Sequence, residues 1–129
     1  MRKLLVKYEL DIEPFSFGGK KGEDFNKRER IRKLIVQKYP DFSQYHIEQK
    51  LADCTDIDVV LNCYLKKPLE KDIDNLAKIP IDAIFFSAKD EPGVKNKSES
   101  KISSLVINKI NSETNHLEVI IYGMQPERQ

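Results

Sequence analysis

Strict alternation of apolar and polar residues at two places is the feature that most limits what this chain can fold into. Apolar side chains stand at every second position from Leu4 to Ile12 and again from Ile57 to Leu65, with mostly polar residues between them. A period of two puts successive side chains on opposite faces of a strand. Both stretches are therefore predicted to be strands with one buried and one wet face.

The stretch between these two strands changes period. From Asp24 to Tyr39 the apolar residues recur every three or four positions, at Ile31, Leu34, Ile35 and Tyr39, and Pro40 follows. This spacing predicts a helix that ends at the proline. A short helix is also expected around residues 44–51.

The C-terminal part reads as two more strands, residues 102–110 and 117–122, joined by the turn-like residues 111–115. We interpret this pattern as a β-hairpin. Phe85 and Phe86 are expected to lie in the core. The element order predicts one α+β domain over residues 1–129, with a small mixed β-sheet packed against two main helices.

Composition is that of an ordinary soluble domain, since 33% of the 129 residues are charged and 40% are hydrophobic. The net charge is only +1, but residues 1–50 hold 12 Lys and Arg against 8 Asp and Glu, whereas residues 51–99 hold 7 against 10. A basic first third therefore precedes an acidic middle. A basic surface can follow phosphates, and clustered carboxylates can hold a metal.

The cysteine pattern and the hydropathy limit the location and the kind of site. Cys54 and Cys63 lie nine residues apart without any Cys-x-x-Cys, so no zinc site is expected and both are interpreted as free thiols, Cys63 buried. No signal peptide or long apolar run is present, and we expect a cytoplasmic protein with no membrane partner.

The acidic stretch from Asp72 to Ala83 carries the strongest chemical signal. Asp74 is expected to cap a helix whose next turns place Lys78 and Asp82 on the same face, with Asp72 just upstream. Pro80 is expected to bend or shorten that helix. Two carboxylates at this point can hold a divalent cation, and Lys78 can reach a phosphate beside it. The alternative is a capped helix whose charged face is only a surface salt bridge.

The run Asp72-x-Asp74-Asn75-Leu76-x-Lys78-x-x-x-Asp82-Ala83 resembles the signature of the RusA-type Holliday junction resolvases. The resemblance implies a RusA-like fold and a homodimeric endonuclease that cuts four-way DNA junctions in recombination and repair. It also implies Mg²⁺ as cofactor, with Mn²⁺ able to substitute. Asp72 and Asp74 would be metal ligands, Lys78 would be catalytic, and Asp82 would orient Lys78 or serve as an alternative ligand.

A third metal ligand is implied by the same resemblance, and the sequence leaves its position open. Alignment by the following strand selects Glu99, whereas distance from Ala83 selects Asp90 or Glu91. We prefer Glu99, because it stands three residues before a predicted strand and a ligand must be held by the scaffold. This region departs from the family pattern, in which a pair of aspartates stands where Ser98 and Glu99 stand here.

The DNA-binding candidates lie on four parts of the chain: the loop 15–22, the first helix, and the segments around Lys71 and Lys101. The glycine-rich loop 15–22 matches no phosphate-loop pattern and is as well interpreted as a connector. Arg28 and Arg32 belong to a basic helix that is either DNA-facing or a solvated surface. The candidates are Lys20, Lys21, Arg28, Arg32, Lys71 and Lys101. Alternatives to junction resolution are a non-catalytic module that binds branched DNA or protein, and a nuclease for flaps or forks.

Overall fold

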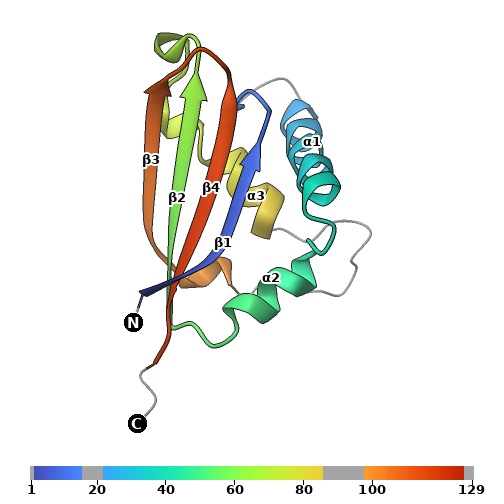
Figure 1. The fold of residues 1–129 in the computed structure, drawn as a ribbon, viewed down its shortest axis with the longest axis vertical. Helices are drawn as coiled ribbons and strands as arrows, with labels where there is room; N and C mark the ends of the chain where they lie inside the picture. Colours follow the sequence, from blue (N-terminus) through green and yellow to red (C-terminus); the bar gives the residue numbers. More distant parts are fainter. Residues whose placement is uncertain (1, 16–21, 86–97, 127–129) are drawn as a thin grey trace.

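A computed structural model of the chain describes residues 2–15, 22–85 and 98–126. The elements are β1 (Arg2–Leu10), α1 (Glu23–Lys38), α2 (Gln44–Leu51), β2 (Asp56–Leu65), α3 (Lys78–Phe85), β3 (Ile102–Asn111) and β4 (His116–Met124), with 3₁₀ turns η1 (Pro68–Glu70), η2 (Ile73–Asn75) and η3 (Glu99–Lys101). The strands form one sheet in the order β1-β4-β2-β3, and the helices lie to one side of it (Figure 1). The mixed α+β class expected from the sequence is confirmed.

The expected C-terminal hairpin is wrong, because β3 and β4 are not neighbours. β4 lies in the centre of the sheet and runs antiparallel to both β1 and β2, while β3 pairs in parallel with the outer side of β2. Two parallel strands need a long crossover between them. The residues between β2 and β3, which include α3, supply that crossover.

The link between β3 and β4 passes across the end of β2 and is fixed there. The Ser112 amide donates to the carbonyl oxygen of Leu65 at 3.0 Å, and the Lys66 amide donates to Oδ1 of Asn115 at 2.8 Å. The link has to bridge two strand spacings, about 10 Å, which its few residues can do. Turn chemistry alone could not distinguish this arrangement from a hairpin of adjacent strands.

The core lies between the sheet and the helices. Alternate residues of β1, β2 and β4 are buried, which confirms the two alternating runs, and Phe85 of α3 is fully buried beneath them. Phe86 lies outside the described residues. Cys54 and Cys63 are both free and Cys63 is buried, as expected, and Cys54 is buried as well. Leu4 is exposed, because a bulge between Leu4 and Val6 shifts the alternation of β1.

Helices α1 and α2 begin and end where the sequence places them. Gly22 starts α1 with a φ of 87°, a left-handed conformation that glycine adopts without strain, and Pro40 follows its end. Ser43 caps α2 by accepting a hydrogen bond from the His46 amide at 3.0 Å. Within the described ranges, no helix has the length and apolar character to cross a bilayer.

The helix of the acidic stretch begins later than expected. Asp74 lies in the 3₁₀ turn η2, and α3 starts only at Lys78, so the prediction that Asp74 caps this helix is wrong. The late start places Pro80 in the first turn of α3, where a proline removes no intrahelical hydrogen bond. The proline thus shortens the helix, which was one of the two expected outcomes.

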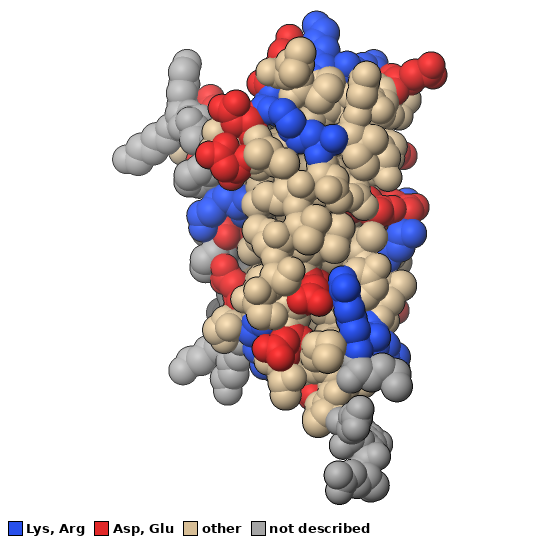
Figure 2. Space-filling view, turned by 90° about the vertical axis from the view of Figure 1, so that its left-hand side faces the viewer, with Lys and Arg blue, Asp and Glu red and all other residues tan. Residues whose placement is uncertain are grey.

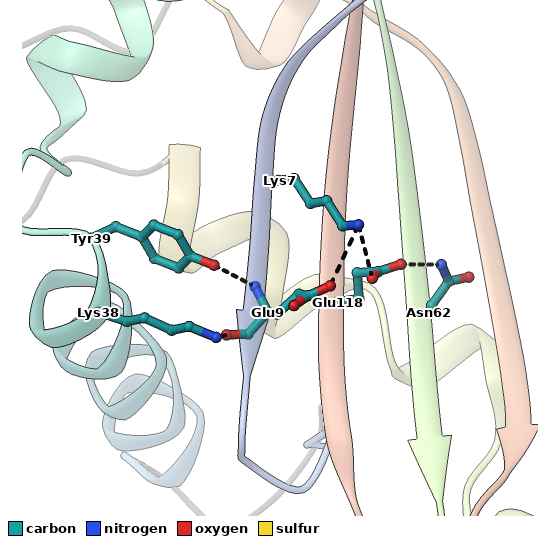
Figure 3. Close-up of polar contacts among 6 residues, drawn as sticks. All are labelled: Lys7, Glu9, Lys38, Tyr39, Asn62 and Glu118. Atoms are coloured by element: carbon teal, nitrogen blue, oxygen red, sulfur yellow. Dashed lines mark hydrogen bonds and ion pairs between the residues drawn. The ribbon is translucent and has the colours of Figure 1, made fainter.

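The outer edge of β1 is closed by side chains from the helices. Tyr39 Oη accepts a hydrogen bond from the Glu9 amide at 3.1 Å, and Lys38 Nζ donates to the Glu9 carbonyl oxygen at 2.8 Å (Figure 3). Lys50 of α2 donates to the Leu5 carbonyl oxygen at 3.3 Å. The backbone groups that an edge strand exposes are partly satisfied here.

Candidate functional site

The candidate site lies on the connection from β2 to α3, which holds both aspartates of the acidic motif. Asp72 precedes η2 and Asp74 lies within it, and both side chains are exposed. The sequence explains the exposure, because Leu76 and Ala77, which follow after Asn75, are the residues that are buried in the core. The turn therefore presents two carboxylates to solvent, and the buried Leu76 and Ala77 anchor the segment in the core.

A lysine from β3 fixes the start of this connection. Lys109 Nζ donates to the carbonyl oxygens of Pro68 at 2.9 Å and Lys71 at 2.6 Å. Lys71 is itself held by an ion pair of 3.3 Å between its Nζ and Oε1 of Glu13. These contacts keep the backbone next to Asp72 in one place, as a binding site requires.

Lys78 and Asp82 form the ion pair that their spacing predicts. Lys78 Nζ lies 3.3 Å from Oδ2 of Asp82, one helical turn away on α3. The lysine side chain is half exposed, whereas the aspartate is largely covered. Asp82 thus holds a cationic group at the surface of α3, and the pair by itself adds little stability.

The structure does not bring Glu99 to Asp72 and Asp74. Glu99 begins η3, three residues before the first residue of β3, whereas Lys109 near the other end of β3 touches the connection from β2 to α3. The strand between Ile102 and Lys109 spans about 23 Å at the usual rise per residue. The fold therefore corrects the expectation for Glu99: it is too far from Asp72 and Asp74 to be their third ligand within one chain.

The segment around Glu99 is instead tied to α2. The buried Ser98 donates through its amide and its Oγ to the two carboxylate oxygens of Glu48, at 3.2 and 3.1 Å. Lys101 Nζ donates to the carbonyl oxygens of Leu51 at 2.9 Å and Ala52 at 3.3 Å, at the end of that helix. Lys101 thus has a structural role as a C-terminal cap, whatever else it contacts.

No three His, Cys, Asp or Glu side chains gather in metal-binding geometry within residues 2–15, 22–85 and 98–126. Asp72 and Asp74 offer hard oxygen donors of the kind that Mg²⁺ takes, usually with several waters retained. The alternatives Asp90 and Glu91 lie outside the described residues. The donor chemistry of the two aspartates fits such a cation, and a further ligand has to come from elsewhere.

The expected DNA contacts on α1 behave differently from each other. Arg32 is buried, donates from Nη1 to the Ala83 carbonyl oxygen at 3.0 Å and packs against Phe42, so it joins α1 to α3. Its expected role as a DNA contact does not fit this burial. Arg28 is partly exposed and lies over the Phe25 ring. Lys20 and Lys21 lie outside the described part of the chain.

A small hollow of about 130 Å³ lies next to the acidic connection. Its lining residues are Glu13, Leu65, Lys66, Lys67, Glu70, Lys71 and Asn115. Three of them are lysines: Lys66 and Lys67 follow β2 directly, and Lys71 follows η1. Positive charge thus lies within a few residues of the two exposed aspartates.

A polar row on the uncovered face of the sheet was not anticipated from the sequence. Asn108 donates to Asn62 at 2.9 Å, Asn62 donates to Glu118 at 2.8 Å, and Lys7 lies 3.7 Å from the other oxygen of Glu118. Figure 3 shows the part of this row that crosses β1, β4 and β2. The sequence signal would have been polar residues at matching outward positions, but the register that aligns them is tertiary information.

The charges of this row shift two pKa values. Glu118 and Glu9 raise the pKa of Lys7, and hydrogen bonds with Glu118 and Lys7 lower the pKa of Glu9. In the core, burial raises the pKa of the Cys63 thiol to about 11 and also raises that of Cys54. Lys7 and Glu9 therefore stay charged at neutral pH, and the two thiols stay neutral.

Comparison with known proteins gives no family assignment. No protein-family model matches the chain, and no curated protein matches it.

Proposed function

We propose that this protein is a Mg²⁺-dependent endonuclease that cleaves branched DNA, above all four-way junctions, as a homodimer. The observation that carries the proposal is the exposed pair Asp72 and Asp74 on a connection that Lys109 anchors, with the Lys78–Asp82 pair on the helix that follows. The resemblance of this stretch to the RusA-type signature gives the reaction and the substrate.

The roles of the residues follow from their chemistry. Asp72 and Asp74 would hold the Mg²⁺ ion through their carboxylate oxygens. When bound, such an ion neutralises phosphate charge and lowers the pKa of a bound water. Lys78 places a positive charge where negative charge develops on the scissile phosphate, and Asp82 keeps its ammonium group oriented.

The DNA backbone would lie along the lysines beside the acidic connection. Lys66 and Lys67 are exposed, and Lys71 lines the same small hollow. Phosphate contacts of this kind hold nucleic acid in register without reading its sequence. Two symmetric cuts across a junction need two such sites, which one chain with one acidic motif supplies only as a dimer.

The position of Glu99 favours a second candidate function, a non-catalytic module that binds branched DNA or a protein. Without Glu99, no three His, Cys, Asp or Glu side chains of the described residues gather in metal-binding geometry at the site. A third ligand from Asp90 or Glu91 would support cleavage, and its absence would support the binding module. Flaps and forks are further substrates that the same site could cut.

A cleavage assay on a mobile four-way junction, with and without Mg²⁺, tests the proposal, and Asp74→Asn tests the site. Mutation of a residue that only hydrogen-bonds to a metal ligand typically lowers activity by about 10–100-fold. Asp74 would be a ligand itself, so we expect Asp74→Asn to lower activity by more than that. Junction binding should stay the same or tighten, because a negative charge near phosphate is lost. Glu70→Gln in the same connection is the matched control and should cleave normally.

Direct titration with Mn²⁺ separates the two candidate functions. An endonuclease should bind Mn²⁺ through Asp72 and Asp74, and Asp74→Asn should weaken that binding while Glu70→Gln does not. Junction binding without Mn²⁺ binding or cleavage would support the binding module. Normal turnover by Asp74→Asn would remove the site assignment.

Lys78→Ala tests the role of the cation on α3. We expect turnover to fall more than junction affinity, since a charge placed for the transition state acts mainly there. An equal loss in both would make Lys78 an ordinary phosphate contact.

A further inference from the structure

We propose that the free edge of β3 pairs antiparallel with β3 of a second copy of this chain, so that the two sheets become continuous. The proposed interface is argued from the structure of the β3 edge alone. The conclusion that the interface brings two cleavage sites together also depends on the proposed function.

The edge of β3 is apolar and open. Leu105 is 42% exposed and Val106 is 44% exposed, on opposite faces of the same strand. Figure 2 looks onto this side of the molecule and shows a broad band without charged groups between charged groups above and below. No charged residue occurs from Ile102 to Asn108. Edge strands that stay unpaired usually carry lysines, prolines or bulges that prevent pairing. The bulge of β3 lies at its start, between Ile102 and Ser104, and leaves residues 104–108 regular.

The backbone of β3 is also available. In the described part of the chain, no side chain hydrogen-bonds to the backbone of Ile102–Asn111, whereas helix side chains satisfy the edge of β1 at Leu5 and Glu9. A strand edge of this length presents a row of unpaired N–H and C=O groups. Another strand is the partner that satisfies all of them together.

The β3 sequence is complementary to itself, which identifies the partner as a second copy. In an antiparallel pair with Val106 on the two-fold axis, Val106 faces its own copy and Leu105 faces Ile107. Ser104 then faces Asn108, and the bulge at Ser103 ends the regular pairing there. Apolar residues thus meet apolar residues and polar residues meet polar ones along the strand, as cross-strand pairing favours.

The symmetry of this pair has a consequence for the candidate site. A two-fold axis between antiparallel strands of one sheet runs through the sheet, so both helix-covered faces lie on the same side. Each acidic connection touches its own β3 through Lys109, three residues from the axis. Both aspartate pairs would therefore lie on one side of the dimer, where one branched DNA could contact both.

Solution mass at micromolar concentration, without DNA or metal, tests the interface independently of any nuclease activity. The wild-type chain should form dimers. Val106→Lys and Val106→Glu should each weaken self-association by about tenfold or more, because each places like charges face to face on the axis. Mixing the two variants should restore a dimer, since Lys then faces Glu. Val36→Lys, an equally exposed valine on α1, is the matched control and should dimerise normally.

The results separate cleanly. A monomeric wild type, or Val106→Lys dimerising like wild type, would overturn the interface, and failure of the mixture to recover would overturn the register. If a charged variant does not fold, Val106→Cys replaces it. Oxidation should then cross-link two copies at position 106 but not in Val36→Cys. A normal dimer without metal-dependent cleavage would leave the interface standing and reject the proposed nuclease.

Discussion

The two edges of the sheet are treated in opposite ways. At the β1 edge, Lys38, Tyr39 and Lys50 reach across from α1 and α2 and bind backbone groups of β1. At the β3 edge, Leu105 and Val106 are exposed and the described residues leave the backbone open. The difference indicates that helix side chains protect the edge of β1 from pairing, whereas the edge of β3 is left open to a partner strand.

Side chains are also packed more tightly near the β1 edge than near the β3 edge. The bulge in β1 turns Leu5 inward over Gly123 of β4, where Cys54 packs as well. On the inner face of β3, η1 and η2 cover mainly the part near Lys109, and Leu105 stays exposed. Substitutions near β1 should therefore cost stability, whereas those on β3 should act through assembly.

The largest effect is expected for Gly123→Ala, which adds a methyl group to the tightly packed β1 side. The new Cβ would overlap Sγ of Cys54 and lie 2.6 Å from Cδ1 of Leu5. Overpacking of this kind costs about 1–3 kcal/mol in the free energy of unfolding. Chemical denaturation measures it.

A double-mutant cycle serves as its control. In a Cys54→Ala background the Gly123→Ala substitution should cost clearly less, because the overlapping sulfur is gone. An equal cost in both backgrounds would mean that the packing at Cys54 is looser than the structure indicates.

A smaller effect is expected for Tyr39→Phe, which removes the hydroxyl that accepts from the Glu9 amide. The ring still packs against Tyr8, so the change isolates the hydrogen bond. The expected loss is about 0.5–1.5 kcal/mol. Faster hydrogen exchange at the Glu9 amide would locate the change at the β1 edge. Tyr64→Phe on the open face, with its ring stacked on His116, is the control and should change neither quantity.

Cys63 reports on the β3 side of the sheet as pH rises. Burial raises the pKa of Cys63 to about 11, from an ordinary value of 9.0, and Cys63 lies beside Lys109 of β3. Folding is favoured by the neutral thiol, so this contribution is complete below pH 9 and is lost as pH rises toward 11. The loss amounts to roughly 1 kcal/mol or less at pH 9.5.

Thiol labelling of the folded protein measures the same property. Cys63 should react slowly at pH 8 and faster at each higher pH, because only the thiolate attacks. Rapid reaction of Cys63 at pH 8 would mean that β3 opens readily and exposes β2. The dimer proposed here should slow the reaction further at high protein concentration.

The sequence predicted the local elements well, because alternation at Val6, Tyr8 and Leu10 and the helical spacing of Ile31 and Ile35 depend only on neighbours. Strand order was not accessible, since the position of β4 between β1 and β2 depends on a link that crosses Leu65. The predicted start of α3 is too early. The sequence alone does not distinguish a proline in the first turn of a helix from one in the helix interior, because the position of the helix start is not known.

The candidate site was predictable in part for the same reason. The contact between Lys78 and Asp82 follows from local spacing and is confirmed. Glu99 was grouped with Asp72 and Asp74 through its nearness to β3 in sequence, but parallel pairing puts the start and end of that strand on opposite sides of the molecule. The role of Lys109, which binds the backbone of the connection from β2 to α3, was not predictable, because the sequence shows only a lysine within a predicted strand.

The smallest effect on the folded monomer is expected for Leu105→Thr, which places a β-branched strand former at this exposed position. In dilute solution its free energy of unfolding should stay within about 0.5 kcal/mol of wild type, as for most surface substitutions. Wild-type stability should rise with protein concentration, because a dimer binds only the folded state. Leu105→Thr should reduce that rise, since it removes the apolar contact with Ile107 of the second copy. Leu61→Thr is the contrasting control: Leu61 is fully buried on the adjacent strand, so this variant should be destabilised at every concentration. A wild-type stability independent of concentration would show that the edge of β3 stays unpaired and that its exposed leucine and valine have no partner.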